Sequence, residues 1–291
     1  MPATMYGRIA AGAALEPLRR RPDALPEREL RRDGIAVDRR RLAVYDRVCG
    51  FQVGDTLPAT YPHVLAFPLA MELMASGSFP FGVLGLVHVG NTIDQLRPLD
   101  AGVPLDLRVW AERLAAHRRG RTVDIVAEGY VDGELAWRDR STYLHREAQR
   151  NGPDPTVQRN RPDPVGATAE WDVAGDIGRR YAAGDIGRRH AAVSGDRNPI
   201  HLHGLSARLF GQKAAIAHGM WTKAHCLAAL QGHLPAAFSV EVAFKLPVLL
   251  PARVAFASWT DGDVRRFALR DARSGKPHVE GNVSPSASPA A

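Results

Sequence analysis

The chain has 291 residues, of which 45% are hydrophobic and 24% charged, as is typical of a soluble globular protein with room for two domains. No apolar run reaches the roughly 18–20 residues of a membrane span, and the N-terminal charges follow the weak apolar stretch, unlike those of a secretory signal. Two cysteines, Cys49 and Cys226, are too few for a disulfide framework, so we expect a cytoplasmic protein.

The net charge of +7 comes almost entirely from arginine. Two explanations stay open: the codon usage of a GC-rich genome, and an anionic partner such as a phosphorylated coenzyme or an acidic carrier protein. Arginines cluster at 19–21, 39–41 and 118–121, but no aromatic stacking residues or nucleic-acid motif accompany them. We therefore expect no nucleic-acid partner.

The first half of the chain predicts one buried helix followed by strands. Tyr61–Ala75 is apolar almost throughout and predicts the helix. The pair Asp132-Gly133 predicts a tight hairpin turn between two of the strands. The predicted strands are Val87–Leu99, Val103–Leu114, Thr122–Val131 and Glu134–His145.

The second half predicts the same order of elements after a linker. Residues 146–170 contain four prolines and no apolar periodicity, which predicts the linker. Ile216–Leu230 predicts a buried helix, and the alternation over Ser239–Val248 predicts a half-buried strand. Further strands are predicted at Arg253–Trp259, Val264–Arg270 and His278–Val283.

A helix followed by an antiparallel meander, twice over, indicates an internally duplicated α+β chain. We expect an N-terminal domain at 1–145, the linker at 146–170 and a C-terminal domain at 171–283. The tail 284–291, SPSASPAA, is expected to be disordered.

Two adjacent nine-residue segments, 175–183 and 184–192, are nearly identical. Nine residues advance a helix by 2.5 turns, so both copies cannot make the same contacts from one continuous helix. The second copy stays in register with the sequence that follows. We expect it to keep the native position and the first copy to be extruded or to extend the preceding loop.

The segment Ser194-Gly195-Asp196-Arg197-Asn198-Pro199-Ile200-His201 is the strongest candidate for chemistry. Pro199 disfavours helix at Asn198, and the small polar residues before it favour a tight turn. Such a turn brings Asp196 and His201 together as a candidate acid–base pair. From the residues alone, a helix-capping turn with an incidental histidine is an equal alternative.

This segment resembles the signature of the MaoC-like, or hydratase-2, family of (R)-specific enoyl-thioester hydratases. The similarity extends through 207–211, 215–220 and 243–248, whereas the first half contains no such motif. The resemblance implies a double hotdog, in which two antiparallel sheets each wrap around a central helix. The central helices would lie at Gly219–Leu230 and within Tyr61–Ala75, with one active site per chain.

The resemblance further implies reversible syn addition of water to a trans-2-enoyl thioester. Asp196 and His201 would move the protons, and the backbone N–H of Gly219 at the helix N-terminus would stabilise the enolate-like oxygen. The residues implied to bind substrate or shape the site are Gly219, Asn198, Ser194, Phe244 and His218.

The implied substrates are acyl-CoA or acyl-carrier-protein thioesters, of medium to long chain. A contact to the coenzyme is implied for His88 and for Arg118 or Arg119, although a solvated hairpin end explains the two arginines equally well. No cofactor and no metal is implied, because the thioester already acidifies the proton at C2 and the histidines lack metal-ligand spacing. The oligomeric state stays open, with a homodimer as one option.

One position departs from the family pattern. His190 stands where a tyrosine or phenylalanine is usual, and Tyr181 occupies the equivalent place in the first copy of the repeat. Two rival functions also stay open. One is a non-catalytic acyl-thioester-binding subunit; the other is a hotdog thioesterase, which needs a carboxylate on the central helix, where only Glu72 is available.

Overall fold

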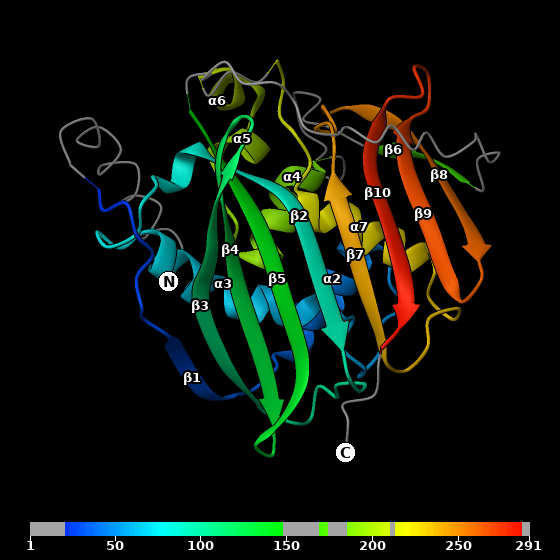
Figure 1. Ribbon diagram of the computed structural model, residues 1–291. Helices are drawn as coiled ribbons and strands as arrows, with labels where there is room; N and C mark the ends of the chain where they lie inside the picture. The colour runs from blue at the N-terminus through cyan, green and yellow to red at the C-terminus, as the bar shows by residue number, and fades with distance from the viewer. Residues whose placement is uncertain (1–20, 148–168, 174–184, 210–212, 287–291) are drawn as a thin grey trace.

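A computed structural model describes residues 21–147, 169–173, 185–209 and 213–286 (Figure 1). Its centre is one ten-stranded antiparallel sheet with the order β1-β3-β4-β5-β2-β7-β10-β9-β8-β6. Strands β2 and β7 pair at the centre, so hydrogen bonds continue from one half of the chain into the other. The expected α+β double hotdog is confirmed.

Within residues 21–147, the first half supplies five strands and two long helices. The turn at Asp132 and Gly133 has positive φ at both residues, 53° and 80°, so the predicted hairpin is confirmed. Neither β1 nor α2 was predicted. The elements are β1 (Leu30–Ile35), α2 (Arg39–Cys49), α3 (Tyr61–Met74), β2 (Leu86–Gln95), β3 (Leu105–His117), β4 (Gly120–Val131) and β5 (Glu134–Arg146).

The second half repeats this layout with more helices before its sheet. The predicted helix begins at Gly219 rather than at Ile216, because Ile216 pairs with Leu249 in an isolated bridge. The elements are β6 (Ala169–Val173), α4 (Ile186–Ser194), α5 (Pro199–Leu202), α6 (Gly204–Leu209), α7 (Gly219–Ala229), β7 (Phe238–Phe244), β8 (Ala252–Asp261), β9 (Val264–Asp271) and β10 (Pro277–Pro285).

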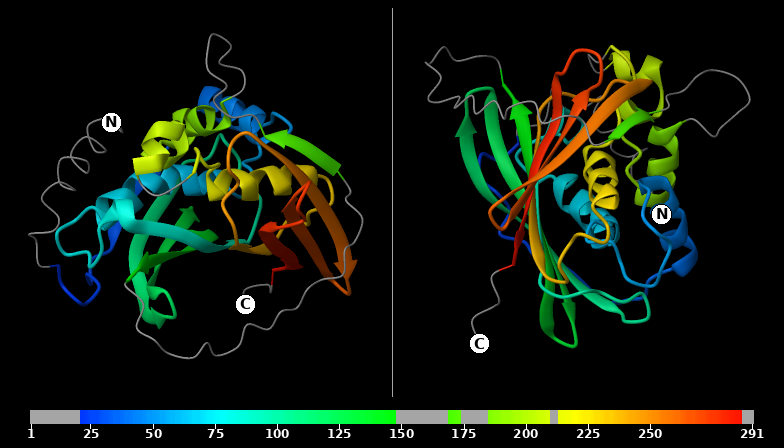
Figure 2. Two further views of the ribbon diagram at one scale, coloured as in Figure 1. Left: turned by 90° about the horizontal axis from the view of Figure 1, so that it is seen from above. Right: turned by 90° about the vertical axis from the view of Figure 1, so that its right-hand side faces the viewer.

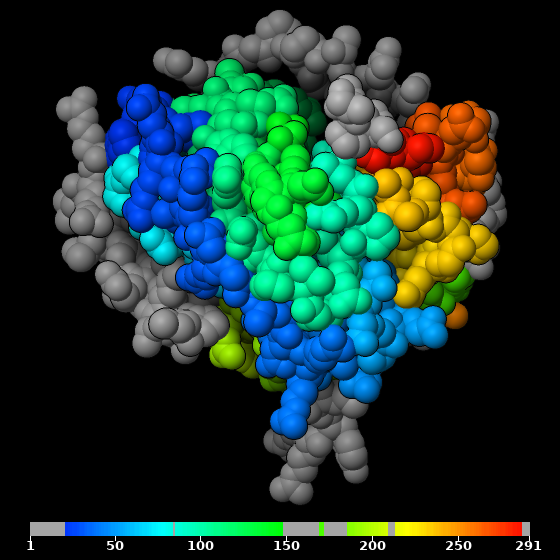
Figure 3. Space-filling view, turned by 90° about the horizontal axis from the view of Figure 1, so that it is seen from below, coloured from blue at the N-terminus to red at the C-terminus, as the bar shows by residue number. Residues whose placement is uncertain are grey.

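The two halves follow one plan. Read from its outer edge, the first gives β1-β3-β4-β5-β2 and the second β6-β8-β9-β10-β7, so each strand has a counterpart in the same relative position. Seen from below, the first half in blue and green lies beside the second in yellow and red (Figure 3). This order supports the internal duplication predicted from the sequence.

The helices of the described residues cover one face of the curved sheet, with α3 and α7 lying against it and α2 and α4 outside them (Figure 2). Helix α3 has Pro at its first turn and is buried on almost every side, which explains its continuous apolar sequence. No helix of the described ranges has the length and apolar character needed to cross a bilayer.

Several predicted segments lie partly outside the described residues. Strand β5 runs to Arg146 and β6 begins at Ala169, while 148–168 of the expected linker lie outside those residues. Strand β10 extends to Pro285, two residues into the expected tail, of which 287–291 are not described. The second copy of the repeat begins α4, with Asp185 as its N-cap, whereas the first copy lies outside the described residues.

Candidate active site

The Ser194–His201 segment forms a tight turn between two helices. Helix α4 ends at Gly195, whose φ of 82° favours glycine, and α5 starts at Pro199. The backbone N–H of Asn198 donates to Asp196 Oδ1 at 3.1 Å. The side-chain oxygen of Asn198 caps α5 by accepting from the Ile200 N–H at 3.4 Å. Asn198 therefore stabilises the turn that carries Asp196.

Within the turn, Ser194 has a supporting position. Its hydroxyl accepts the backbone N–H of Asp196 at 3.2 Å, and its side chain is buried. The Asp196 side chain is 25% exposed and lines the cavity described below. Ser194 thus holds the backbone of Asp196, while the carboxylate itself stays accessible.

His201 is buried and has one ring nitrogen fixed. Its Nδ1 donates to the backbone oxygen of Ile216 at 2.8 Å, which leaves Nε2 without the proton in the neutral ring. Burial lowers the pKa of His201, and the nearby Asp196 carboxylate partly offsets this effect. The Nε2 atom can therefore accept a proton near neutral pH.

His218 belongs to the same cluster. Its ring stacks on that of His201 with centroids 3.7 Å apart, and its Nε2 donates to the backbone oxygen of Asp196 at 3.0 Å. Burial and the neighbouring imidazoles hold the pKa of His218 well below its usual value. His218 occupies the N-cap position of α7 without a side-chain capping bond, so its contacts serve the Asp196–His201 pair instead.

Helix α7 begins directly after His218, with its N-terminus at Gly219. A Cβ placed on Gly219 would lie 3.2 Å from Cζ of Phe244, closer than nearly all such contacts. Glycine therefore lets the Phe244 ring pack against the helix start. The first backbone N–H groups of a helix also carry its positive dipole end.

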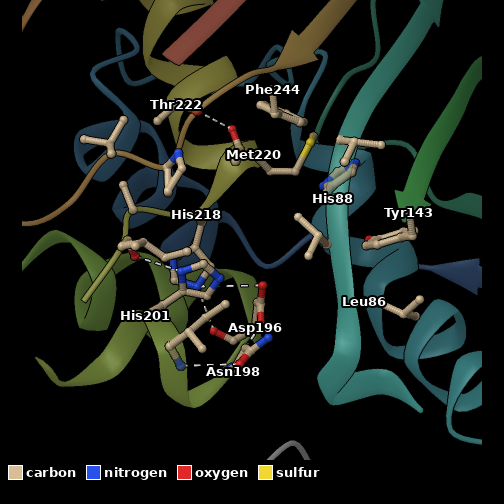
Figure 4. A pocket seen from close by; sticks show the side chains of 18 of the residues that line it. Leu86, His88, Tyr143, Asp196, Asn198, His201, His218, Met220, Thr222 and Phe244 are labelled. Atoms are coloured by element: carbon tan, nitrogen blue, oxygen red, sulfur yellow. Dashed lines mark hydrogen bonds and ion pairs between the residues drawn. The ribbon is translucent and has the colours of Figure 1, made fainter. Parts of the chain in front are cut away.

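These residues line one cavity of about 520 Å³ (Figure 4). Asp196, Asn198, His201 and His218 lie on one wall, whereas His88, Tyr143 and Leu86 lie across from them. The lining also includes Met220 and Phe244. Both halves of the chain therefore contribute to the cavity, although the sequence places its motif in only one.

The comparisons with known proteins agree with this architecture. The MaoC-like domain family matches residues 181–282. A 3-hydroxyacyl-thioester dehydratase X of Mycobacterium tuberculosis is 36% identical over 283 residues, covering 97% of this chain and 98% of that protein. The chain belongs to the MaoC-like dehydratase family.

Solved structures lead to the same family. The crystal structure of HtdX of Mycobacterium tuberculosis has a TM-score of 0.77 at 33% identity and covers 89% of this chain and all of that one. A MaoC-like dehydratase of Phytophthora capsici has a TM-score of 0.71 at 18% identity, over 90% of this chain and 96% of that one, which shows the fold alone. The family resemblance read from the sequence is thus confirmed.

The three coenzyme candidates of this MaoC-like protein also line the cavity, but in different settings. Arg118 and Arg119 lie on the hairpin that joins β3 and β4. The ring of His88 instead lies between Tyr143 and Phe244, with centroids 4.6 and 4.9 Å away. Burial lowers the pKa of His88 to about 3. A neutral imidazole in this position offers no charge to a phosphate.

His190, the residue that departs from the family pattern, is buried beside the active-site cluster. Its ring lies 4.6 Å from His218 and 6.3 Å from Tyr45. Among the described residues, neither of its ring nitrogens has a hydrogen-bond partner, and burial lowers its pKa to about 3. The imidazole therefore occupies an aromatic position as a neutral ring.

Asp196, His201 and His218 bring ligand-type atoms within 4.8 Å of one another, a grouping the sequence spacing did not suggest. Imidazoles that bind one ion direct their nitrogens to a common point about 2 Å away. Rings stacked at 3.7 Å with planes inclined by 25° instead direct them along nearly parallel planes. This geometry favours proton transfer over ion binding.

Other residues of the site have no signal in the sequence. Arg41 donates from Nε to the backbone oxygen of Val193 at 2.8 Å, so α2 supports the end of α4. Its neighbour Arg39 pairs with Asp55. Two arginines of the 39–41 cluster thus have partners within the chain. Nothing in their local pattern distinguishes them from surface arginines, because their partners lie far away in sequence.

Proposed function

We propose that this chain is an (R)-specific hydro-lyase that interconverts (3R)-3-hydroxyacyl thioesters and trans-2-enoyl thioesters in fatty-acid metabolism. The observation that carries the proposal is the placement of Asp196 and His201 together on the cavity wall beside the N-terminus of α7. The name of the Mycobacterium tuberculosis relative, a 3-hydroxyacyl-thioester dehydratase, supports the same reaction.

In this mechanism the pair Asp196 and His201 holds one water molecule between the two side chains. In hydration, the water oxygen forms a bond to C3 while the pair accepts one water proton and the C2=C3 π electrons shift towards the thioester oxygen. These electrons then form the C–H bond at C2 with a proton that the pair delivers. The pair thus returns to its starting protonation state. Dehydration runs through the same steps in reverse. The neutral His201 Nε2 suits the role of proton acceptor.

Charge develops on the thioester oxygen during this step. The N–H of Gly219 and the positive end of α7 would stabilise it, with Phe244 placing the acyl group against the helix start. A hydrogen bond aimed at this oxygen contributes most in the transition state, where the charge is largest. No redox step is needed.

The carrier of the acyl group would bind near the basic side chains of the cavity lining. Arg118, Arg119, Arg146 and Lys245 all line the cavity. Positive charge at this place suits a phosphorylated carrier, either CoA or an acyl-carrier protein. We propose medium to long acyl chains, because both halves of the chain line a cavity of about 520 Å³.

The test is loss of the conjugated enoyl-thioester absorbance with enoyl-CoA and enoyl-carrier-protein substrates of several lengths. Asp196→Asn and His201→Ala should each remove hydration while the variant proteins remain folded, as circular dichroism would show. Full turnover in both variants would reject the assignment. Absence of turnover in the unaltered protein, with retained thioester binding, would favour the non-catalytic binding subunit.

A thiol-release assay on the same substrates separates hydration from hydrolysis. The thioesterase alternative needs a carboxylate in the cavity from a central helix. Glu72 does not line the cavity; it is half exposed and pairs with Arg28 at 3.1 Å. The structure therefore disfavours hydrolysis.

Two broader proposals concern the compartment and the oligomeric state. We propose a reducing cytoplasm, because Cys49 and Cys226 are both free and buried. We also propose a homodimer, which sedimentation of the purified protein would test.

A further inference from the structure

A second histidine lines the cavity from the half of the chain that lacks the motif. His63 lies in the first turn of α3, and Val64 and Phe67 of the same helix also line the cavity. The Nδ1 atom of His63 is 2.5 Å from Oδ2 of Asp139, and the two side chains are 14% and 2% exposed. His63 thus has a fixed orientation on a wall otherwise formed by apolar residues of α3.

A buried polar network holds this pair in place. Oδ1 of Asp139 accepts from Asn91 Nδ2 at 2.6 Å and from Ser141 Oγ at 3.0 Å. Oδ1 of Asn91 in turn accepts from Lys223 Nζ at 2.5 Å. The network joins α3, β5, β2 and α7, which meet where the two halves of the sheet pair.

Burying such a network costs folding free energy, so we expect it to have a functional benefit. Charged groups in a protein interior lose much of their hydration, and both Asp139 and Lys223 are almost fully buried. Lys223 also donates to the backbone oxygen of Val240 at 3.0 Å. All of these contacts fix the position of one imidazole at the cavity, and the proton transfers assigned to Asp196 and His201 do not require it.

The hydrogen bonding defines what His63 can bind. The positive charge of the groups around Asp139, His63 above all, keeps the pKa of Asp139 below its usual value despite burial. The carboxylate is therefore ionised and only accepts hydrogen bonds. Because it faces this ionised carboxylate, Nδ1 of His63 carries a proton in both the neutral and the charged ring, and Nε2 is the nitrogen left for a ligand. A hydroxyl group can donate to this nitrogen, and it can accept from it when the ring is protonated.

We propose that His63 determines specificity by binding a hydroxyl group on the acyl chain beyond C3, so that the preferred substrates are thioesters with an oxygen-bearing chain. This proposal rests on the hydro-lyase function proposed above. A plain alkyl chain would leave the His63 nitrogen without a partner in the complex. A site built around a hydrogen bond discriminates against a substrate that lacks the matching group.

The experiment compares kcat/KM for unsubstituted enoyl-CoA substrates with a series in which one hydroxyl is moved carbon by carbon along the chain. In the unaltered protein, at least one hydroxylated member should exceed its unsubstituted partner by about tenfold, the value of one well-placed hydrogen bond. His63→Phe should remove this preference, mainly through KM, because it should lower kcat/KM more for the hydroxylated member than for its unsubstituted partner.

Two further variants make the result decisive. In His63→Phe the buried Asp139 carboxylate loses its hydrogen bond to the His63 ring, and the variant could fail to fold for that reason. The double variant His63→Phe with Asp139→Asn also removes the negative charge of that carboxylate. His145→Phe makes the same ring exchange at a histidine outside the cavity lining, and it should keep the preference.

The outcomes separate this proposal from the one on which it rests. Turnover with no preference anywhere in the series, or an equal loss on all substrates in His63→Phe, overturns the specificity role alone. No turnover with any thioester rejects the hydro-lyase proposal, and the role of His63 with it.

Discussion

The imidazole rings of His201 and His218 stack with centroids 3.7 Å apart and planes inclined by 25°. His218 also bonds the backbone oxygen of Asp196, so one side chain supports both members of the candidate acid–base pair. Neither contact could be read from the spacing of the motif, because His218 lies 17 residues after His201 and follows a separate segment of the chain.

Replacing His218 by phenylalanine should keep the stack but remove the bond to Asp196. We expect kcat/KM for enoyl-CoA hydration to fall about fivefold, which corresponds to about 1 kcal/mol for one hydrogen bond. His225→Phe is the matched control: His225 lies on the same helix, bonds the backbone oxygen of Cys49 at 2.8 Å and does not line the cavity. An equal loss in both variants would assign the effect to general weakening of α7.

The pH dependence of activity should follow the lowered pKa of His201. Its neutral form accepts the proton, and burial makes that form persist to lower pH than the ordinary value of 6.5. We therefore expect kcat/KM to be retained at pH 6.5 and to decline only below it. A pH–rate profile whose acidic limb begins above pH 6.5 would contradict this assignment of the base.

The start of α7 should not tolerate a methyl group. In Gly219→Ala the new Cβ would meet the Phe244 ring at 3.2 Å, and relief of such overpacking typically costs about 1–3 kcal/mol. We expect kcat/KM to fall tenfold or more, and Phe244→Leu added to Gly219→Ala to recover part of it. Gly54→Ala, where a Cβ meets nothing within 4 Å, should leave the activity unchanged.

Replacing His190 by phenylalanine should stabilise the protein at pH 7. The change places an aromatic ring at the position and removes two buried nitrogens that have no hydrogen-bond partner in the part of the chain that the structure describes. One such group typically costs about 1–3 kcal/mol. Chemical denaturation should show a higher free energy of unfolding, and a lower value would indicate that the imidazole has an unrecognised partner.

His190→Phe should also lose less free energy of unfolding than the parent protein when the pH is lowered. The folded-state pKa of His190, about 3, lies below its ordinary value of 6.5, so the unfolded chain binds more protons between these two values. Stability should therefore fall as the pH drops from 6.5, by up to about 1.4 kcal/mol per pH unit for this one group. Denaturation of both proteins at pH 6.5 and 5 should give a smaller decline in His190→Phe.

Arg41 should prove to be a supporting residue of the site. Arg41→Met keeps the aliphatic part of the side chain but loses the donor to Val193 at the end of α4. We expect a lower melting temperature and a severalfold lower kcat. Arg40→Met is the control, because Arg40 is the exposed neighbour in the same helix; a similar effect there would point to the charge of the cluster instead.

Much of the fold followed from local patterns. The apolar run at Tyr61 and the alternation around Val240 predicted the first central helix and a core strand. Burial on all sides produces a continuous apolar run, and burial on one side of a strand produces an alternation. Strand β1 escaped prediction because its residues Arg31 to Gly34 are exposed and carry no alternation. Helix α2 begins with three arginines, which read as a charged cluster rather than as a helix start.

The candidate site divides in the same way. The sequence by itself determined the family, the turn that carries Asp196 and His201, and the glycine at the start of α7, because these features depend on short-range backbone chemistry. Only the tertiary structure decided that His63 shares the cavity with that turn, that the ring of His88 packs between Tyr143 and Phe244, and that His218 stacks on His201. Their contacts join residues far apart in the chain, and sheet pairing between the two halves creates a proximity that no local pattern encodes.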